Sequence, residues 1–178
     1  TPVREATLML AQQGLLEVRP RKGVRIATLS LTDMEEIYAV LTELESLAAE
    51  EAARKHYSKA DLADLKASIE AMDKALSDED RDAWAEADDA FHTELVRLGG
   101  NSRVQNIVAM MANQVRRARA MTLYIRPLPI KSNQDHRSVY DAIRTGDAAN
   151  AREQHRLHRR HAREVLIDLL KKHRLFQL

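Results

Sequence analysis

The chain has 178 residues, of which 44% are hydrophobic, so it can bury one substantial core and hold part of a second domain. Its 28 Lys and Arg residues nearly balance 27 Asp and Glu residues, which excludes a global basic field, and any contact with nucleic acid must be local. The absence of cysteine excludes disulfides, thiolate metal sites and cysteine nucleophiles. No apolar run approaches the ~20 residues that cross a bilayer, and no secretory signal opens the sequence, so we expect a cytoplasmic protein without membrane contact.

The first segment carries the start and stop signals of a short helix. Thr1 can cap it, Pro2 suits the first helical position, and Gly14 suits the position after its end. In residues 15–29, β-prone residues flank a Pro-Arg-Lys-Gly turn at residues 20–23, which predicts a hairpin with a basic tip. A helix followed by a hairpin is the C-terminal part of a winged helix-turn-helix, which we assign to residues 1–29.

From Ser30 onward the apolar residues recur with a period of 3.6, and Gly, Pro and Asn occur at the breaks. This pattern predicts a mainly α fold, an antiparallel helical bundle that forms a second domain over residues 30–178. Expected helices span approximately residues 32–55, 59–76, 81–98, 101–124, 132–144 and 147–172.

Acidic and imidazole side chains interrupt the apolar stripes of three of these helices. Asp88 and His92 share one face of the third bundle helix, His136 continues the stripe of the fifth, and His158 that of the last. One carboxylate and several imidazoles suit Zn²⁺, Ni²⁺ or Mn²⁺ with open coordination positions. Hydrogen-bonded core histidines and an intrahelical Asp88–His92 ion pair remain the alternatives at this point.

Other basic residues on these helices fit better as solvated or flanking groups. His155, His161 and His173 lie in or near a charged helical face. Arg116 and Arg117 belong to a similarly charged stretch. We expect none of the five to bind a ligand.

Two stretches of sequence resemble a known family of bacterial transcription regulators. The N-terminal stretch is similar to the end of the GntR winged-helix signature and reads TPVREATLMLAQQGLLEVRPRKGVRIATL. The rest resembles the FCD domain of the FadR subfamily, through the segments ADDAFHTELVRLGGN and DHRSVYDAIRTGDAANAREQHRLH. The resemblance covers nearly the whole chain and implies a DNA-binding regulator, expected to be a repressor and not an enzyme.

The resemblance also implies a ligand set. The metal ligands of metal-binding family members fall on Asp88, His92, His136 and His158, the four residues that the apolar stripes also select. The family often has an arginine facing the effector pocket from its first FCD helix, where this chain has Thr42. We therefore predict that another arginine holds the effector and choose Arg119, whose alternative is a solvated charge.

The same resemblance implies operator recognition by a two-fold homodimer. The front of the DNA-binding domain is absent from this sequence, so we expect the segment alone to bind operator DNA weakly. The expected contacts come from the recognition helix and the wing: Arg4, Glu5, Thr7, Arg21, Lys22, Gly23 and Arg25.

Together these features predict a regulator whose helical domain binds a divalent transition metal and a small organic acid that changes operator binding. Three alternatives remain open: a regulator for which the metal itself is the signal, a metal-free acyl-CoA sensor, and a metal-dependent hydrolase. The sequence offers no clear general acid or base beside the four ligands, which counts against the hydrolase.

Overall fold

The computed structural model describes residues 1–28 and 30–175. Its N-terminal part consists of helix α1 (Pro2–Gln12) and an antiparallel hairpin of β1 (Leu16–Arg19) and β2 (Gly23–Ile26). Arg19 pairs with Gly23, and Gly23 has a φ of +87°, which a residue without a side chain adopts readily. The expected helix and hairpin are both present, and Leu29, which the hairpin was expected to include, lies outside the described residues.

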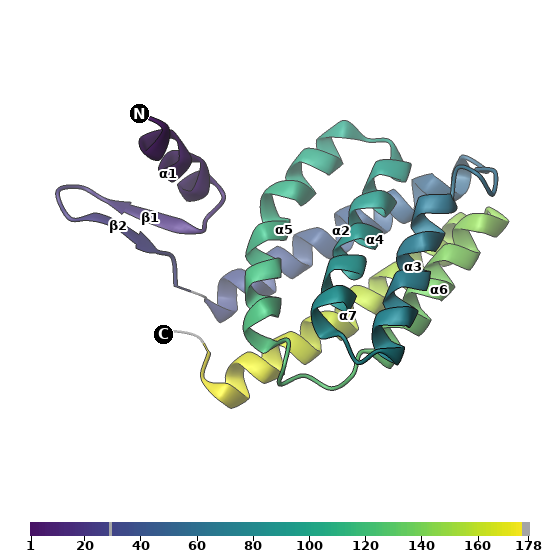
Figure 1. The fold of residues 1–178 in the computed structure, drawn as a ribbon. Coiled ribbons are helices and arrows are strands. Elements are labelled where there is room, and N and C mark those ends of the chain that lie inside the picture. The colour runs from purple at the N-terminus through teal and green to yellow at the C-terminus, as the bar shows by residue number, and fades with distance from the viewer. Residues whose placement is uncertain (29, 176–178) are drawn as a thin grey trace.

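The remaining described residues fold into the expected helices. Their bounds are α2 (Leu31–Arg54), α3 (Ala63–Ser77), α4 (Arg81–Gly99), α5 (Ser102–Thr122), α6 (Ile130–Thr145) and α7 (Ala148–His173). The predicted all-helical class of this region is thus confirmed, and Figure 1 shows the helices packed into one bundle, with α2 and α7 running at an angle to α4 and α5. Residues 176–178 are not described.

Two helices begin elsewhere than the sequence predicted. Helix α3 begins at Ala63 because Asp61 Oδ2 accepts hydrogen bonds from Ser58 N at 2.9 Å and Ser58 Oγ at 2.7 Å, which hold the preceding residues in a turn. Helix α6 begins at Ile130, after the N-cap residue Pro129, so Ser132 lies inside the helix and does not open it as expected.

Two clusters of buried side chains stabilise the bundle. One centres on α3, α4 and α6 and includes Met72, Phe91 and Leu95; the other joins α2, α5 and α7 and includes Tyr38 and Leu166. Of the described residues, those before Ser30 belong to neither cluster. Figure 1 accordingly shows α1 and the hairpin standing beside α5, apart from the other helices.

A close crossing of α2 and α4 depends on Gly99. A Cβ built at Gly99 would lie 2.8 Å from both Cα and Cβ of Ala48. We expect Gly99→Ala to lower the free energy of unfolding by about 1–3 kcal/mol, because the two backbones must separate. Urea unfolding measures this effect, and Ala48→Gly in the same chain should recover part of it. Unchanged stability of Gly99→Ala would show that the crossing adjusts freely.

A membrane-spanning helix requires both length and sustained apolar character. Within the described part of the chain, none of the helices has both.

Candidate metal centre

The structure brings the four predicted ligands together in the interior of the bundle. Asp88 and His92 come from α4, His136 from α6 and His158 from α7, and all four side chains are buried. One nitrogen from each of the three imidazoles lies within 4.8 Å of the others. His92 Nε2 lies 3.4 Å from His158 Nε2 and 3.7 Å from Asp88 Oδ2, while His136 Nε2 lies 3.6 Å from Asp88 Oδ1.

Helix geometry and packing explain this convergence. Asp88 and His92 are one turn apart, so both point from the same face of α4. The ring of Phe91 packs against His136 with centroids 4.3 Å apart, and the ring of His158 lies at the same centroid distance from His136. Packing of these rings therefore positions His136 within the cluster.

The polar atoms of this cluster have few protein partners. Among the described residues, neither ring nitrogen of His136 has a hydrogen-bond partner, although the side chain is fully buried. Leaving a buried polar group unsatisfied costs about 1–3 kcal/mol. The Asp88–His92 distance of 3.7 Å also exceeds hydrogen-bond length, which disfavours the intrahelical pair as the reason for their placement. A carboxylate and three converging imidazoles are a donor set that fits a divalent transition metal.

Burial and the neighbouring charges set the protonation states needed for metal binding. Burial lowers the pKa of His158 to about 4. Burial also holds the pKa of His136 well below its usual range, and the positive charge that His158 can carry lowers it further. Burial opposes ionisation of Asp88, but the positive charge of the adjacent Arg119 outweighs it and lowers the pKa of this carboxyl. Asp88 is thus ionised and the imidazoles His136 and His158 neutral near pH 7, as ligands must be.

These shifts predict an acid-sensitive fold. His136 and His158 bind protons more weakly in the folded than in the unfolded protein, so the free energy of unfolding should fall as pH drops from about 6.5 towards 4. Each such imidazole contributes a slope of up to about 1.4 kcal/mol per pH unit. Melting the protein in chelator between pH 7 and 4.5 measures the effect. A melting temperature that does not change over this range would contradict the assigned neutral imidazoles.

A second buried cluster, which the sequence analysis missed, adjoins the first. Glu45 of α2 forms a bidentate ion pair with Arg159 of α7, and Arg159 Nε donates to Glu45 Oε2 at 2.8 Å. The prediction that His155 is solvated was wrong: it is fully buried, with Nε2 3.3 Å from Glu45 Oε2 and Nδ1 3.2 Å from Ser46 Oγ. His161 and His173, by contrast, are exposed as expected.

The sequence did contain a signal for this cluster. Glu45 lies one turn from the apolar residues Leu41 and Ala49, so it shares the buried face of α2. His155 and Arg159 are likewise one turn apart, on the face of α7 that includes Leu166. A charge on an apolar face predicts a partner of opposite charge, but only the packing of α2 against α7 identifies that partner.

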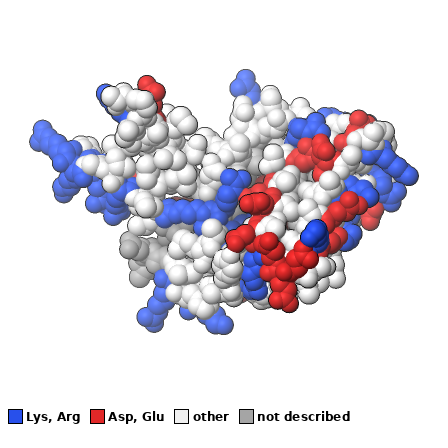
Figure 2. Space-filling view, in the orientation of Figure 1, with Lys and Arg blue, Asp and Glu red and all other residues white. Residues whose placement is uncertain are grey.

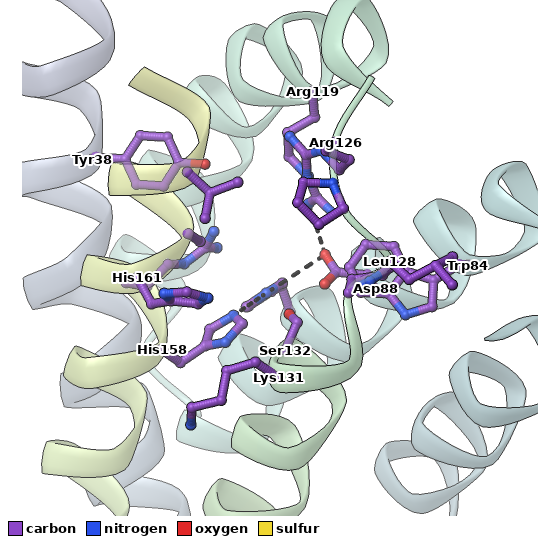
Figure 3. A pocket seen from close by; sticks show the side chains of 16 residues that line it. Tyr38, Trp84, Asp88, Arg119, Arg126, Leu128, Lys131, Ser132, His158 and His161 are labelled. Carbon is purple, nitrogen blue, oxygen red and sulfur yellow. Dashed lines mark hydrogen bonds and ion pairs between the residues drawn. The ribbon is translucent and has the colours of Figure 1, made fainter. Parts of the chain in front are cut away.

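A cavity of about 230 Å³ opens beside the predicted metal ligands. Asp88, His92 and His158 line it together with aromatic, aliphatic and basic side chains. Figure 3 shows Arg119 and Arg126 close to Asp88, with His158 and His161 on the opposite wall.

The two arginines of this cavity differ in their partners. Arg119 NH1 lies 2.7 Å from Asp88 Oδ2, so this residue, predicted to hold the effector, already pairs with a predicted metal ligand. Arg126 donates to Thr122 Oγ1 at 2.8 Å, and its buried Nε has no hydrogen-bond partner among the described residues. Burial, followed by the like charge of Arg119, lowers the pKa of Arg126 to about 10, so it stays cationic at neutral pH. Thr42 does not line the cavity; its hydroxyl donates to the Tyr38 carbonyl oxygen at 2.6 Å.

The residues expected to contact DNA lie in the N-terminal part, away from the cavity. Most of their side chains are exposed. Those of the wing lie at the hairpin, where Figure 2 shows a group of Lys and Arg side chains. Acidic side chains gather elsewhere, over α3 and α4. Two of the expected residues already have partners: Thr7 Oγ1 donates to the Val3 carbonyl at 2.8 Å, and Arg25 forms a bidentate pair with Glu17. Arg4, Glu5, Arg21 and Lys22 are exposed and have no side-chain partner within the described part of the chain, and Gly23 is exposed beside the turn.

The described residues thus form a helical bundle with a buried polar cluster, preceded by a short helix and a hairpin. The sequence profile of the FCD domain matches residues 36–161, and the chain belongs to this family of GntR-type regulators.

Known proteins similar to the chain are named as regulators. It is 33% identical over 147 residues to the "Probable D-xylose utilization operon transcriptional repressor" of Paenarthrobacter nicotinovorans, covering 83% of this chain and 64% of that protein. It is 30% identical over 160 residues to an uncharacterized HTH-type transcriptional regulator of Streptomyces ambofaciens, covering 90% of this chain and 66% of that protein. The chain thus spans just under two thirds of the length of these relatives.

A solved structure of McbR/YncC from E. coli has a similar fold, with a TM-score of 0.83 at 18% sequence identity; the match covers 94% of this chain and 84% of that one. The family and the similar proteins are transcriptional regulators and not enzymes, as the sequence predicted.

Proposed function

We propose that the chain is the sensing part of a transcriptional repressor. In this proposal residues 30–178 form a metal-dependent effector-binding and dimerisation domain, and residues 1–29 are the end of a winged helix-turn-helix that binds operator DNA as a homodimer. The names of similar proteins support regulation of transcription, and the exposed basic hairpin supports contact with phosphates.

The observation that carries the proposal is the convergence of Asp88, His92, His136 and His158 in a buried site where His136 has no other polar partner in the described structure. Zn²⁺, Ni²⁺ and Mn²⁺ accept such ligands. A bound ion would satisfy the buried nitrogens and link α4, α6 and α7.

The effector in this proposal is a small carboxylate. The cavity adjoins the metal ligands, so a carboxylate oxygen could take an open coordination position. Arg126 supports this choice because it presents a charged group to the same cavity, whereas Arg119 pairs with Asp88. We therefore assign the main effector contact to Arg126 and give Arg119 the role of holding Asp88.

Arg126→Gln should weaken carboxylate binding without removing the metal. Calorimetry of the zinc-loaded chain with citrate as the probe should show roughly 10- to 100-fold lower affinity, because a charge-assisted hydrogen bond is lost. Arg103→Gln, which changes an exposed arginine on α5, should bind citrate as the unaltered chain does. Equal citrate affinity in both variants would remove Arg126 from the effector site.

Regulation itself is tested with a protein in which residues 1–29 are part of a complete winged helix-turn-helix. Metal and citrate, added separately and together to such a protein, should change its affinity for operator DNA only when both are present. A response to metal alone would instead make the metal the signal, and no response to either would contradict the proposed sensing role.

A further inference from the structure

The buried carboxylate of Glu45, which lies outside the predicted ligand set, is surrounded by nitrogen atoms of three basic side chains. Arg159 donates to both of its oxygens. His92 Nδ1 lies 3.0 Å from Glu45 Oε2, and His155 Nε2 lies 3.3 Å from the same oxygen. Both imidazoles thus face one anionic oxygen atom.

An ionised carboxylate can only accept hydrogen bonds, so each ring nitrogen facing it must carry a proton. For neutral His92 this places the proton on Nδ1 and leaves the lone pair on Nε2. Nε2 is also the atom that faces His158 and Asp88. The contact with Glu45 therefore selects the one neutral tautomer of His92 in which the nitrogen inside the cluster can bind a metal.

The same reasoning disfavours a metal between Glu45, His92 and His155, whose ligand atoms are also close together. With a proton on Nε2 towards Glu45, His155 has its lone pair on Nδ1, where Ser46 Oγ lies at 3.2 Å and can donate. The guanidinium of Arg159 also places a positive charge next to the Glu45 carboxylate. These groups suit a hydrogen-bond network and not a second cation.

We propose that Glu45 is a positioning residue for the metal centre: it holds His92 as the Nδ1–H tautomer with Nε2 directed at the metal. This inference rests on the proposed metal-binding function. Carboxylates behind metal-binding imidazoles orient the ring and raise its basicity, and losing such a partner lowers metal affinity about 10- to 100-fold. Asp135 Oδ2 lies behind His158 Nδ1 at 3.8 Å, which is a looser version of the same arrangement.

Glu45→Gln tests the proposal because it keeps the shape of the side chain while replacing one acceptor with a donor. Either orientation of the amide removes the negative charge behind His92, and the orientation with NH₂ in the place of Oε2 also presents a donor to His92 Nδ1 and favours the opposite tautomer. The matched control is Glu43→Gln, two residues earlier on α2, where the carboxylate is half exposed and contacts Arg152 and Arg156.

Two readouts are needed. Nitrogen-15 NMR of the metal-free protein reports which ring nitrogen of His92 carries the proton, and titration with Co²⁺, followed by visible absorption, reports affinity and ligand geometry. We expect the Nδ1–H tautomer in the unaltered chain and in Glu43→Gln. Glu45→Gln, which lacks the charge, should show a weaker preference for this tautomer, bind Co²⁺ about 10- to 100-fold more weakly and give a changed spectrum.

Unchanged Co²⁺ affinity and an unchanged spectrum in the Glu45→Gln variant would overturn the proposal. So would an Nε2–H tautomer of His92 in the unaltered protein, a result that does not depend on whether the variant folds. If the unaltered chain shows the Nδ1–H tautomer but binds neither Co²⁺ nor Zn²⁺, the metal centre itself fails, and the contact between Glu45 and His92 stands only as a structural one.

Discussion

Alanine in place of His136 is expected to abolish the stabilisation of the fold by metal. His136 is the only predicted ligand on α6, so its loss disconnects this helix from a metal held by α4 and α7. Ligand binding to the folded state adds about 2.7 kcal/mol at 100 times the dissociation constant, which corresponds to roughly 5–11 °C in melting temperature for a domain of this size. The unaltered chain should gain this increment on adding Zn²⁺, and His136→Ala should not.

Removing the ring also leaves a space beside Phe91, which destabilises the protein independently of metal. The test is therefore the difference between melting in Zn²⁺ and in chelator, measured separately for each protein. His173→Ala, at an exposed position near the end of α7, should keep the full increment. An equal increment in His136→Ala would exclude this residue from the metal centre.

Glu45→Leu is expected to cause the largest loss of stability. The substitution leaves the guanidinium of Arg159 buried without its carboxylate, which costs about 3–5 kcal/mol. Urea unfolding in chelator measures this loss without a contribution from metal. Glu43→Leu, which removes a half-exposed carboxylate from the same helix, should change stability by less than about 1 kcal/mol.

The double variant Glu45→Leu with Arg159→Met separates a cost of unpaired charge from a cost of packing. Replacing both members of a buried ion pair with apolar side chains is often neutral or stabilising. We expect the double variant to be more stable than Glu45→Leu alone. A double variant less stable than either single variant would show that the pair is needed for the packing of α2 against α7.

Most of the local structure could be predicted from the sequence because its signals are local. Asp80 and Asn101 cap α4 and α5 through their side chains, and the apolar period defines each helix. The two errors in helix starts arose from a side-chain turn at Ser58 and from Pro129 at an N-cap, where competing local hydrogen bonds or backbone restrictions decide the boundary.

The candidate metal ligands could also be selected in advance. Asp88 and His92 occupy an apolar face, as do His136 and His158, and an interruption of a periodic pattern is visible in a single sequence. What periodicity cannot supply is the pairing between helices that are far apart in the chain.

Sequence by itself thus determined the helical class, the basic hairpin and the four polar residues directed into the core. The tertiary structure alone decided that Arg119 pairs with Asp88, that Arg126 faces the cavity, and that Glu45, His155 and Arg159 form one buried network. The physical reason is that helical periodicity fixes which face a side chain occupies, whereas its partner depends on how two helices are rotated and shifted against each other.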